Sequence, residues 1–498
     1  MRRVWVRELA GWAGAIGVAL AVAGQVAASA RSELMFRDGD SLIVAMFARS
    51  LLAGGPLDWA MSSVLFLPES AVFATLQAVL PWTLDALLAL SGVLNLLALY
   101  GALRLVAGRR RPGRAPVAWS LIALGVFGAI AATETSASRD ALELASLQLT
   151  TTYYAATVVA VVAVIGLLRR ALERDGGVTL LFVSTGAVTA LSVLTNPLFA
   201  VWATVPLSAL LAFWAVRGVR RPRMLALIGV LVGSSAVGFL ARIPFAAWIA
   251  NTGVGYAQPE RWAESIGYYG ALLAERLSTP WGVLGTLLIT VLIVVAVWRT
   301  VRATDDGERL VATASWLVPV LVTIGAIALG THAARYLQPA VFAPVLALLA
   351  APRVLLAARA SRLVAIAAAG AIVIAGAIGV PRLVTAVQRP DADLACVVDW
   401  VQSSGRTGAG QFWTVRLPKA HLSDPARLVQ VDHRLNGYAW LVNRTDLDVG
   451  EVTFLVEDAQ SVRWELPSGA EPDAVVTCGR YRILDFGSGA LPVGPPHS

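Results

Sequence analysis

The sequence predicts a polytopic α-helical membrane protein, with about eleven transmembrane helices and a small extracytoplasmic α/β domain at its C-terminal end. Of its 498 residues, 57% are hydrophobic and only 14% are charged, whereas soluble domains are about half apolar and a quarter charged. The apolar residues cluster in runs of about 20, the length at which a helix crosses a bilayer. Near residue 381 the composition changes. These features exclude a soluble enzyme, a disordered chain and a fibrous protein, and they predict a transmembrane domain over 1–380 and a soluble domain over 381–498.

Eleven segments are expected to span the membrane, near residues 9–30, 82–107, 115–133, 153–170, 178–195, 197–216, 224–248, 281–299, 310–330, 336–357 and 362–380. An odd number of spans places the two termini on opposite sides. Residues 1–30 also have the basic start and small-residue end of a cleaved signal peptide. Their apolar part is longer than most signal sequences have, which favours an uncleaved first span.

The positions of the basic residues predict the orientation. The net charge is +8, from 40 basic and 32 acidic residues. Six arginine clusters between the spans place about 21 basic residues on one side, against about seven in the opposite loops. Because basic residues are retained on the cytoplasmic side, the N-terminus is expected inside and the C-terminus outside. We therefore expect a plasma-membrane protein, of bacterial origin and with no nucleic-acid partner.

The first outer loop, residues 31–81, contains an unusual acidic pair. Asp38-Gly39-Asp40 follows Arg37 and precedes an apolar stretch, residues 41–53, whose pattern is typical of a helix lying along the membrane surface. Asp40 or Ser41 is a candidate N-cap for that helix. Capping and solvated loop charge are the ordinary roles of such acids. The membrane-surface position, the neighbouring arginine and the helix that follows favour a functional site.

Other candidate residues lie in the remaining outer loops. Arg139 and Glu143 have the i,i+4 spacing of a short helix from Ser138, and form either a surface ion pair or a second acidic wall. Arg242 lies near the outer end of a span, where a cation is either functional or reaches to the interface. His332 and Arg335 share a short outer loop, where they have either a structural role or form an anion site.

The C-terminal segment predicts a helix over 391–403, followed by short strands. The strands are expected over 411–417, 428–432, 438–442, 451–456, 474–477 and 481–486. Cys396 on the helix and Cys478 at a strand end are the two cysteines of the chain, and they can form a disulfide if this domain faces an oxidising compartment. No catalytic group of residues is evident in this segment.

This organisation resembles the GT-C superfamily of integral-membrane glycosyltransferases, which use polyprenyl-phosphate-linked sugars. The residues that carry the resemblance are Asp38-Gly39-Asp40, Glu143, and Arg335-Tyr336 before a span that contains Pro339. The resemblance implies inverting transfer of a hexose or pentose to a glycan, lipid or protein acceptor on the outer side. It implies Asp38, or next Asp40, as the base that deprotonates the acceptor.

The same resemblance suggests the roles of the other candidates. The cations and their neighbours would bind the sugar phosphate, because arginine matches phosphate geometry. The candidate substrate-binding residues are Arg37, Arg139, Glu143, Arg242, His332, Arg335 and Tyr336. Asp38 and Asp40 could hold Mg²⁺ or Mn²⁺ through carboxylate oxygens, although no obligatory metal is expected.

Two other classes of function are considered. A transporter or flippase of a lipid-linked glycan would place polar residues at the bilayer midplane and often contain internal repeats. A non-catalytic assembly protein of the cell envelope would act through its C-terminal domain. The predicted spans are nearly free of ionisable groups, and the polar residues gather on the outer face. This distribution favours chemistry on a lipid-linked substrate at the membrane surface.

Overall fold

The structure is a computed structural model that describes residues 2–174, 176–354 and 358–498. It divides into two compact units. Unit 1 contains Met1–Met35, Ala89–Ile243 and Val254–Ala386. Unit 2 contains Phe36–Leu88, Pro244–Gly253 and Val387–Ser498. Unit 2 thus combines most of the first outer loop with the C-terminal segment, two stretches that the sequence analysis assigned to different domains.

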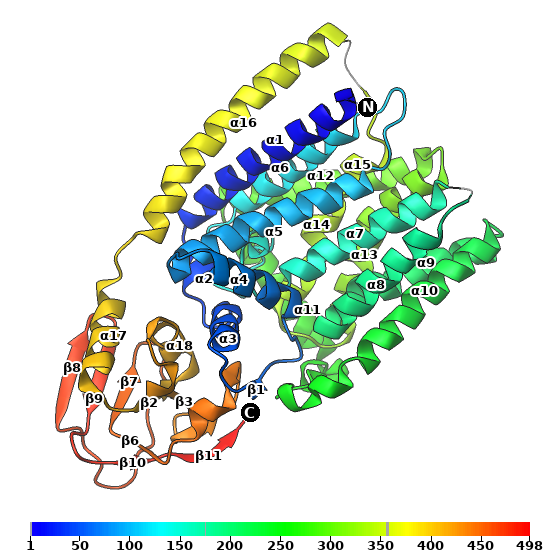
Figure 1. The fold of residues 1–498 in the computed structure, drawn as a ribbon. Helices are drawn as coiled ribbons and strands as arrows, with labels where there is room; N and C mark the ends of the chain where they lie inside the picture. The colour runs from blue at the N-terminus through cyan, green and yellow to red at the C-terminus, as the bar shows by residue number, and fades with distance from the viewer. Residues whose placement is uncertain (1, 175, 355–357) are drawn as a thin grey trace. The chain divides into compact units, whose positions relative to one another are not determined.

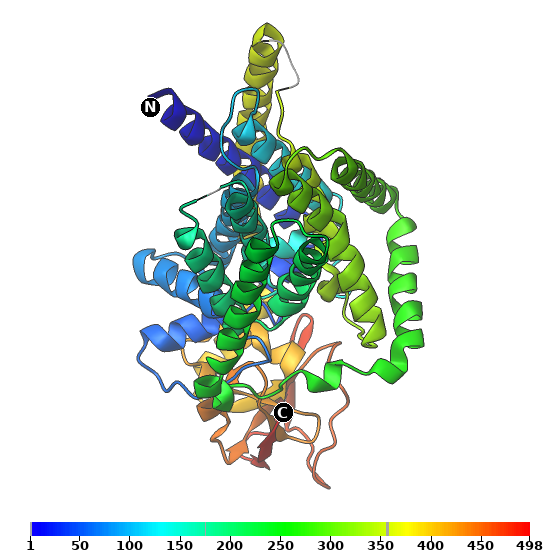
Figure 2. The ribbon, with the colours of Figure 1, turned by 90° about the vertical axis from the view of Figure 1, so that its right-hand side faces the viewer.

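Unit 1 is a helical bundle, and Figures 1 and 2 show its helices running side by side. Among the described residues, seven helices are long and apolar enough to cross a membrane. They are α1 (Arg2–Ala27), α5 (Leu84–Val106), α7 (Ala155–Leu172), α10 (Arg221–Leu240), α12 (Pro280–Arg302), α13 (Asp306–Ala328) and α16 (Ala358–Val387). Each coincides with a predicted span, and the prediction of a polytopic helical membrane protein is confirmed.

The other four predicted spans coincide with shorter apolar helices. They are α6 (Pro116–Ala132), α8 (Thr179–Thr195), a π-helix (Ala200–Thr204) that continues into α9 (Val205–Val216), and a broken segment made of a 3-10 helix (Ala334–Leu337), α14 (Pro339–Val345) and α15 (Ala347–Ala350). Residues 355–357, the end of the predicted span 336–357, lie outside the described part of the chain. Unit 1 also contains two α-helices that the sequence analysis did not predict, α11 (Trp262–Leu277) and most of α2 (Ser32–Phe36).

Helices α1 and α16, which are distant in sequence, pack closely because both carry glycine at the contact (Figure 1). A Cβ atom added to Gly24 would lie 2.3 Å from the carbonyl oxygen of Gly379, and one added to Gly379 would lie 2.3 Å from that of Leu20. Small residues of this kind let the backbones of membrane helices approach each other. Beside this contact, Arg382 donates a hydrogen bond to Gln25.

Unit 2 contains a mixed seven-stranded sheet with the order β11-β4-β3-β2-β7-β9-β8. Its strands are β2 (Gly408–Gln411), β3 (Leu428–Val431), β4 (Asn436–Tyr438), β7 (Phe454–Glu457), β8 (Ala474–Cys478), β9 (Tyr481–Asp485) and β11 (Gly494–His497). A short antiparallel pair joins β6 (Glu451–Val452) to β10 (Leu491–Pro492). The central strands β3, β2 and β7 are parallel to one another. The predicted C-terminal domain that contains strands is therefore present.

Helices α17 (Ala392–Ser404) and α18 (Phe412–His421) bury alternate side chains of the strands. Phe454, Val456 and Ile483 belong to the hydrophobic core that these helices share with the sheet. Leu455 and Leu484, one residue out of phase, belong to a second core cluster. This alternation follows from the two-residue period of a strand.

The predicted strand over 411–417 is wrong beyond Gln411, the last residue of β2, because residues 412–417 form the start of α18. The aromatic and β-branched residues of this stretch favour a strand by propensity. The tertiary structure buries eight of the ten residues of α18, Arg416 and Lys419 among them, so the helix is enclosed on nearly every side. The predicted helix over 391–403 is confirmed as α17, with Asp391 as its N-cap accepting from the N–H of Leu394.

The remainder of unit 2 comes from the first outer loop. It contains α3 (Ile43–Leu52), β1 (Trp59–Ala60) and α4 (Leu67–Val79). Strand β1 pairs antiparallel with β5 (Val442–Asn443), and Met61 exchanges backbone hydrogen bonds with Trp248 and Ala250. These backbone pairings join the first loop, the 244–253 segment and the C-terminal segment within one unit.

Candidate functional site

The acidic pair lies in the turn between α2 and α3. Asp38 and Asp40 are both half-buried, and Gly39 between them is buried. The Oδ2 atom of Asp38 accepts a hydrogen bond from the backbone N–H of Ser41 at 3.2 Å. The carboxylate of Asp38 is thus oriented by the turn that carries it while part of its surface remains accessible.

The predicted N-cap at Asp40 or Ser41 is wrong. Helix α3 begins at Ile43, and its N-cap Leu42 already has helical backbone angles and makes no side-chain capping hydrogen bond. The chain enters α3 through a continuous turn, in which the N–H of Ile43 donates to the carbonyl of Asp40. Because the backbone supplies this contact, the pair is not needed as a cap.

An arginine that the sequence analysis missed holds this turn. Arg416 of α18 is fully buried, and its Nε donates to the carbonyl oxygen of Gly39 at 3.2 Å. Its Nη1 donates to the carbonyl of Leu441 at 2.6 Å. Burial lowers the pKa of Arg416 to about 10, and the charges of Asp40, Asp446 and Asp38 oppose this shift. At neutral pH its guanidinium is therefore still a cation beside the acidic pair.

A second buried cation lies one helical turn further along α18. Lys419, the single lysine of the chain, is fully buried, and its Nζ lies 2.8 Å from Oδ2 of Asp446. The same Nζ donates to the carbonyls of Pro425 and Leu428. Burial lowers the pKa of Lys419, and Asp446 opposes that effect. That the chain has a single lysine was the one sequence signal that could have pointed to these buried cations of α18.

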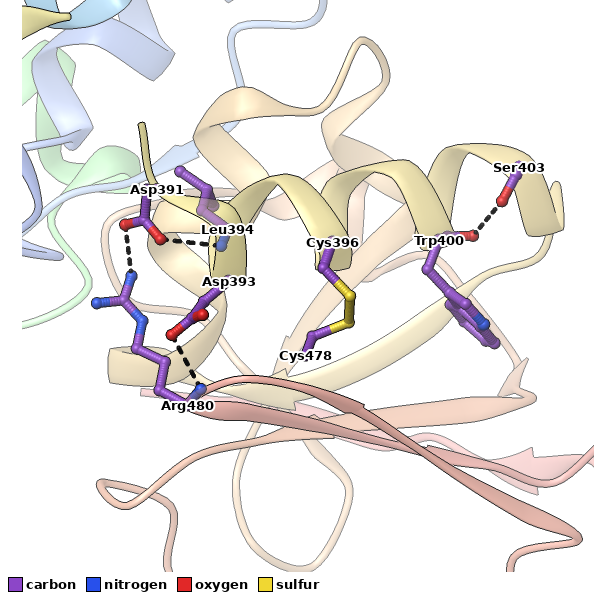
Figure 3. Close-up of a disulfide and its surroundings, with 8 residues drawn as sticks. All are labelled: Asp391, Asp393, Leu394, Cys396, Trp400, Ser403, Cys478 and Arg480. Carbon is purple, nitrogen blue, oxygen red and sulfur yellow. Dashed lines mark hydrogen bonds and ion pairs between the residues drawn. A yellow bond between two sulfur atoms is a disulfide. The ribbon is translucent and has the colours of Figure 1, made fainter. Parts of the chain in front are cut away.

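Arg37, a predicted phosphate ligand, makes an ion pair within unit 2. Its Nε lies 3.2 Å from Oδ2 of Asp391, the N-cap of α17. Arg480 contacts the same oxygen at 3.2 Å, and its backbone N–H donates to Asp393 (Figure 3). Asp391 therefore connects the acidic turn to the C-terminal sheet within unit 2, and part of the positive charge of Arg37 is already compensated.

The predicted disulfide between Cys396 and Cys478 is formed. It joins α17 to β8 just beyond the contacts of Asp391 and Asp393 (Figure 3). The Cα atoms are 5.5 Å apart, although 82 positions separate the two residues in the sequence. A bond of this kind persists in an oxidising compartment.

In unit 1, the second outer loop contains an ordered polar cluster. Arg31 is buried, and its guanidinium donates to Ser146 and to the carbonyls of Ser136, Ser138 and Glu143. The fully buried Glu134, which the sequence analysis assigned no role, accepts from Ala145 and Ser146 and lies 3.8 Å from Arg276. Burial of Glu134 depends on contacts more than ten residues away, so local sequence carried no signal for it.

The predicted helix from Ser138 that would pair Arg139 with Glu143 is wrong. Residues 138–145 form a short turn, bends and irregular backbone, and the first helix after them is a 3-10 helix, Ser146–Leu149. Glu143 is buried, and its carboxylate accepts from the N–H of Ser136. The hydrogen bonds from Arg31 to carbonyls of this loop hold it in a non-helical form.

Arg335 lies among aromatic side chains of unit 1. Its Nε donates to the hydroxyl of Tyr154 at 3.3 Å, and its guanidinium lies 5.8 Å from the ring centre of Tyr336. Asp140 of the second outer loop lies 3.9 Å from it. His332 is exposed, and its ring lies 5.3 Å from that of Tyr268. These residues form a partly exposed cationic and aromatic cluster, which we call the Arg335 cluster.

Arg242, the remaining candidate, lies just beyond the end of α10 and donates to the carbonyl oxygen of Leu194 at 2.7 Å. It thus caps the C-terminal end of α8, where a cation interacts favourably with the helix dipole. The contact with Leu194 supports a structural role for this side chain in unit 1.

The surroundings of the acidic pair fit a divalent metal poorly. Within the described ranges, no group of three or more His, Cys, Asp or Glu residues could hold an ion. Mg²⁺ and Ca²⁺ are usually bound by several oxygen ligands. The acidic pair has Arg416 at its side, and the guanidinium already supplies positive charge there.

Comparison with known proteins found similarity among solved structures. No protein-family model and no curated protein matches the chain. The backbone structure of the chain is similar to that of the oligosaccharyltransferase of Archaeoglobus fulgidus, whose crystal structure is a complex with zinc and sulfate. The two share 14% sequence identity with a TM-score of 0.46, over 89% of this chain and 68% of that one.

Proposed function

We propose that this chain is an integral-membrane glycosyltransferase of the GT-C type. It moves a sugar from a polyprenyl-phosphate donor to an acceptor on the extracytoplasmic side of the membrane. The observation that carries the proposal is the partly accessible acidic pair, Asp38 and Asp40, in a turn packed on α18 within unit 2. The apolar helices of unit 1 suit a substrate whose lipid tail stays in the bilayer.

The reaction follows from the chemistry of the pair. In inverting transfer, the carboxylate of Asp38 takes the proton of the acceptor hydroxyl as that oxygen bonds to the sugar C1 atom. The bond from C1 to the phosphate oxygen breaks at the same time, and the phosphate leaves with the electron pair on its lipid carrier. General-base catalysis of this kind contributes about 10² to 10⁴-fold to the rate.

The departing phosphate gains negative charge and needs cations near it. Arg335 of unit 1 is a candidate, because its guanidinium is only partly buried and the hydroxyl of Tyr154 lies beside it, although Asp140 lies 3.9 Å away. Arg139 and His332 stay candidates for the same role. Arg37 and Arg242 are weaker candidates, since Asp391 and the carbonyl of Leu194 already bind them.

The orientation is part of the proposal. The threefold excess of arginine in alternate loops supports a cytoplasmic N-terminus and an extracytoplasmic C-terminal domain. The disulfide between Cys396 and Cys478 agrees with that side of the plasma membrane, because disulfides persist in oxidising compartments.

The test is transfer or release of sugar by the purified protein in lipid nanodiscs, from a panel of polyprenyl-phosphate sugars. Wild type is compared with Asp38→Asn and with Asp448→Asn, a control that neutralises an exposed acid of the same unit. We expect turnover by wild type and by the control, and a loss of about 10² to 10⁴-fold in Asp38→Asn.

Near-full turnover by Asp38→Asn would show that another base acts, and Asp40 or Glu143 would be tested next. If no donor binds or reacts with wild type, the glycosyltransferase proposal is wrong. The transporter or flippase and the envelope assembly protein would then be the readings to pursue, the first by lipid transport in vesicles and the second by truncation of unit 2.

A further inference from the structure

The side chain of Arg416 is placed to act on both carboxylates of the acidic turn. Its Nε donates to the carbonyl of Gly39, the residue that separates Asp38 from Asp40. Its third nitrogen, Nη2, has no hydrogen-bond partner among the described residues. Two backbone carbonyls therefore hold the guanidinium, and its charge acts on the half-buried carboxylates of Asp38 and Asp40 from a fully buried position.

The turn is packed closely on α18 at Gly39. A Cβ atom added to Gly39 would lie 3.2 Å from Cγ of Arg416 and 3.2 Å from Cε3 of Trp413. A side chain at this position would therefore need Arg416 or Trp413 to shift by a few tenths of an ångström. Neither Arg416 nor Trp413 belongs to the first loop, so the acidic turn depends on the C-terminal segment for both its shape and its charge balance.

Two acidic side chains separated by one residue repel each other and need a compensating cation. In many acidic sites a divalent metal supplies that charge. Here a cation with fixed geometry already lies at the pair, and the guanidinium of arginine stays charged on burial because its ordinary pKa is so high. A dication in the same place would be repelled by the guanidinium.

We propose that the guanidinium of Arg416 takes the place of a divalent cation at Asp38 and Asp40. Arg416 is a positioning residue in this proposal. It holds the turn through Gly39 and compensates one of the two negative charges, so that the other carboxylate is available as a base. The catalytic role of Arg416 rests on the proposed glycosyltransferase function. The proposal that its guanidinium replaces a divalent cation does not.

The first measurement is binding of Mn²⁺, followed by the EPR signal of the free ion, to the full-length protein in nanodiscs of neutral lipid. We expect wild type and the double variant Asp38→Asn/Asp40→Asn to bind the same amount, because the acidic pair is already compensated. We expect Arg416→Gln to gain about one site per chain, and the triple variant with both asparagines to lose it. Arg406→Gln, which frees the single carboxylate of Asp485 in the same unit, is the matched control and should gain none.

The second measurement is turnover with and without a chelator. We expect turnover by wild type to be unchanged by the chelator. Turnover by Arg416→Gln should fall at least tenfold with chelator and recover with added Mn²⁺, whereas Arg416→Lys should stay metal-independent. A variant that had merely lost structural packing would not be rescued by an ion.

Three results would overturn the proposal: Mn²⁺ binding to wild type that disappears in Asp38→Asn/Asp40→Asn, a metal site in Arg416→Lys, or chelator-sensitive turnover by wild type. The first needs no Arg416 variant, so it decides the matter even if Arg416→Gln fails to fold. If the Mn²⁺ results are as expected and no donor reacts, the function proposal fails while the charge substitution stands.

Discussion

Replacing Lys419 by methionine tests whether the buried cations of α18 stabilise unit 2. Methionine keeps most of the apolar stem and removes the charge. In the structure Nζ of Lys419 makes three polar contacts, with Asp446 at 2.8 Å and with the carbonyls of Pro425 and Leu428 at 2.7 and 3.1 Å. No water reaches the lysine side chain, which is fully buried.

The expected loss follows from those contacts. Removing one partner of a fully buried ion pair costs about 3–5 kcal/mol. The side chain of Asp446 retains 15% of its exposure, and it also faces Arg416 and Arg49, so its charge stays partly compensated. The two carbonyls lose a hydrogen bond each, worth about 1 kcal/mol. We therefore expect Lys419→Met to lower the free energy of unfolding of unit 2 by about 2–3 kcal/mol.

The assay is native-state hydrogen exchange of the full-length protein in nanodiscs, measured at the amides of β2 and β3. A loss of this size should reduce protection there by about 30- to 150-fold, since a factor of ten corresponds to about 1.4 kcal/mol. Arg434→Met is the control, because Arg434 pairs with Glu465 in an exposed position and should change stability by less than about 1 kcal/mol. Equal protection in Lys419→Met and the control would refute the reasoning, and would mean that the buried pair is nearly neutral for stability.

Two further predictions concern the C-terminal sheet. Replacing both Cys396 and Cys478 by alanine should lower the free energy of unfolding of unit 2 by about 3–4 kcal/mol, because the disulfide joins residues 82 positions apart. Hydrogen exchange at the amides of β8 and β9 measures this loss, and unchanged protection there would contradict it. Burial raises the pKa of Tyr481 to about 12, so above pH 10 the unfolded chain releases a proton that the folded chain keeps, and wild type loses stability relative to Tyr481→Phe. This loss in the free energy of unfolding, relative to Tyr481→Phe, should reach about 1.4 kcal/mol at pH 11. Urea unfolding of both proteins from pH 8 to 11 measures it. A difference between them that does not change with pH would show that the buried phenol does not titrate as expected.

The sequence by itself determined the features that depend on local composition. The predicted spans coincide with apolar helices because twenty apolar residues have few other ways to satisfy their backbone groups in a bilayer. Helix α17 was predictable because its apolar residues and its N-cap Asp391 lie within one short stretch. The disulfide was predictable because the chain has only two cysteines. The orientation and the roles of the candidate site residues stay predictions.

Only the tertiary structure decided which side chains surround the acidic pair. Arg416 lies 377 residues from Gly39 in sequence. The periodicity of apolar residues predicts local structure and cannot predict a contact over that distance. The same contact explains why residues 412–417 form a helix although their composition favours a strand: the helix buries Arg416 and Lys419 on the side where Gly39 and Asp446 accept them. Local propensity is worth tenths of a kcal/mol for each residue, whereas an unpartnered buried charge costs several, so long-range pairing of charge outweighed local preference.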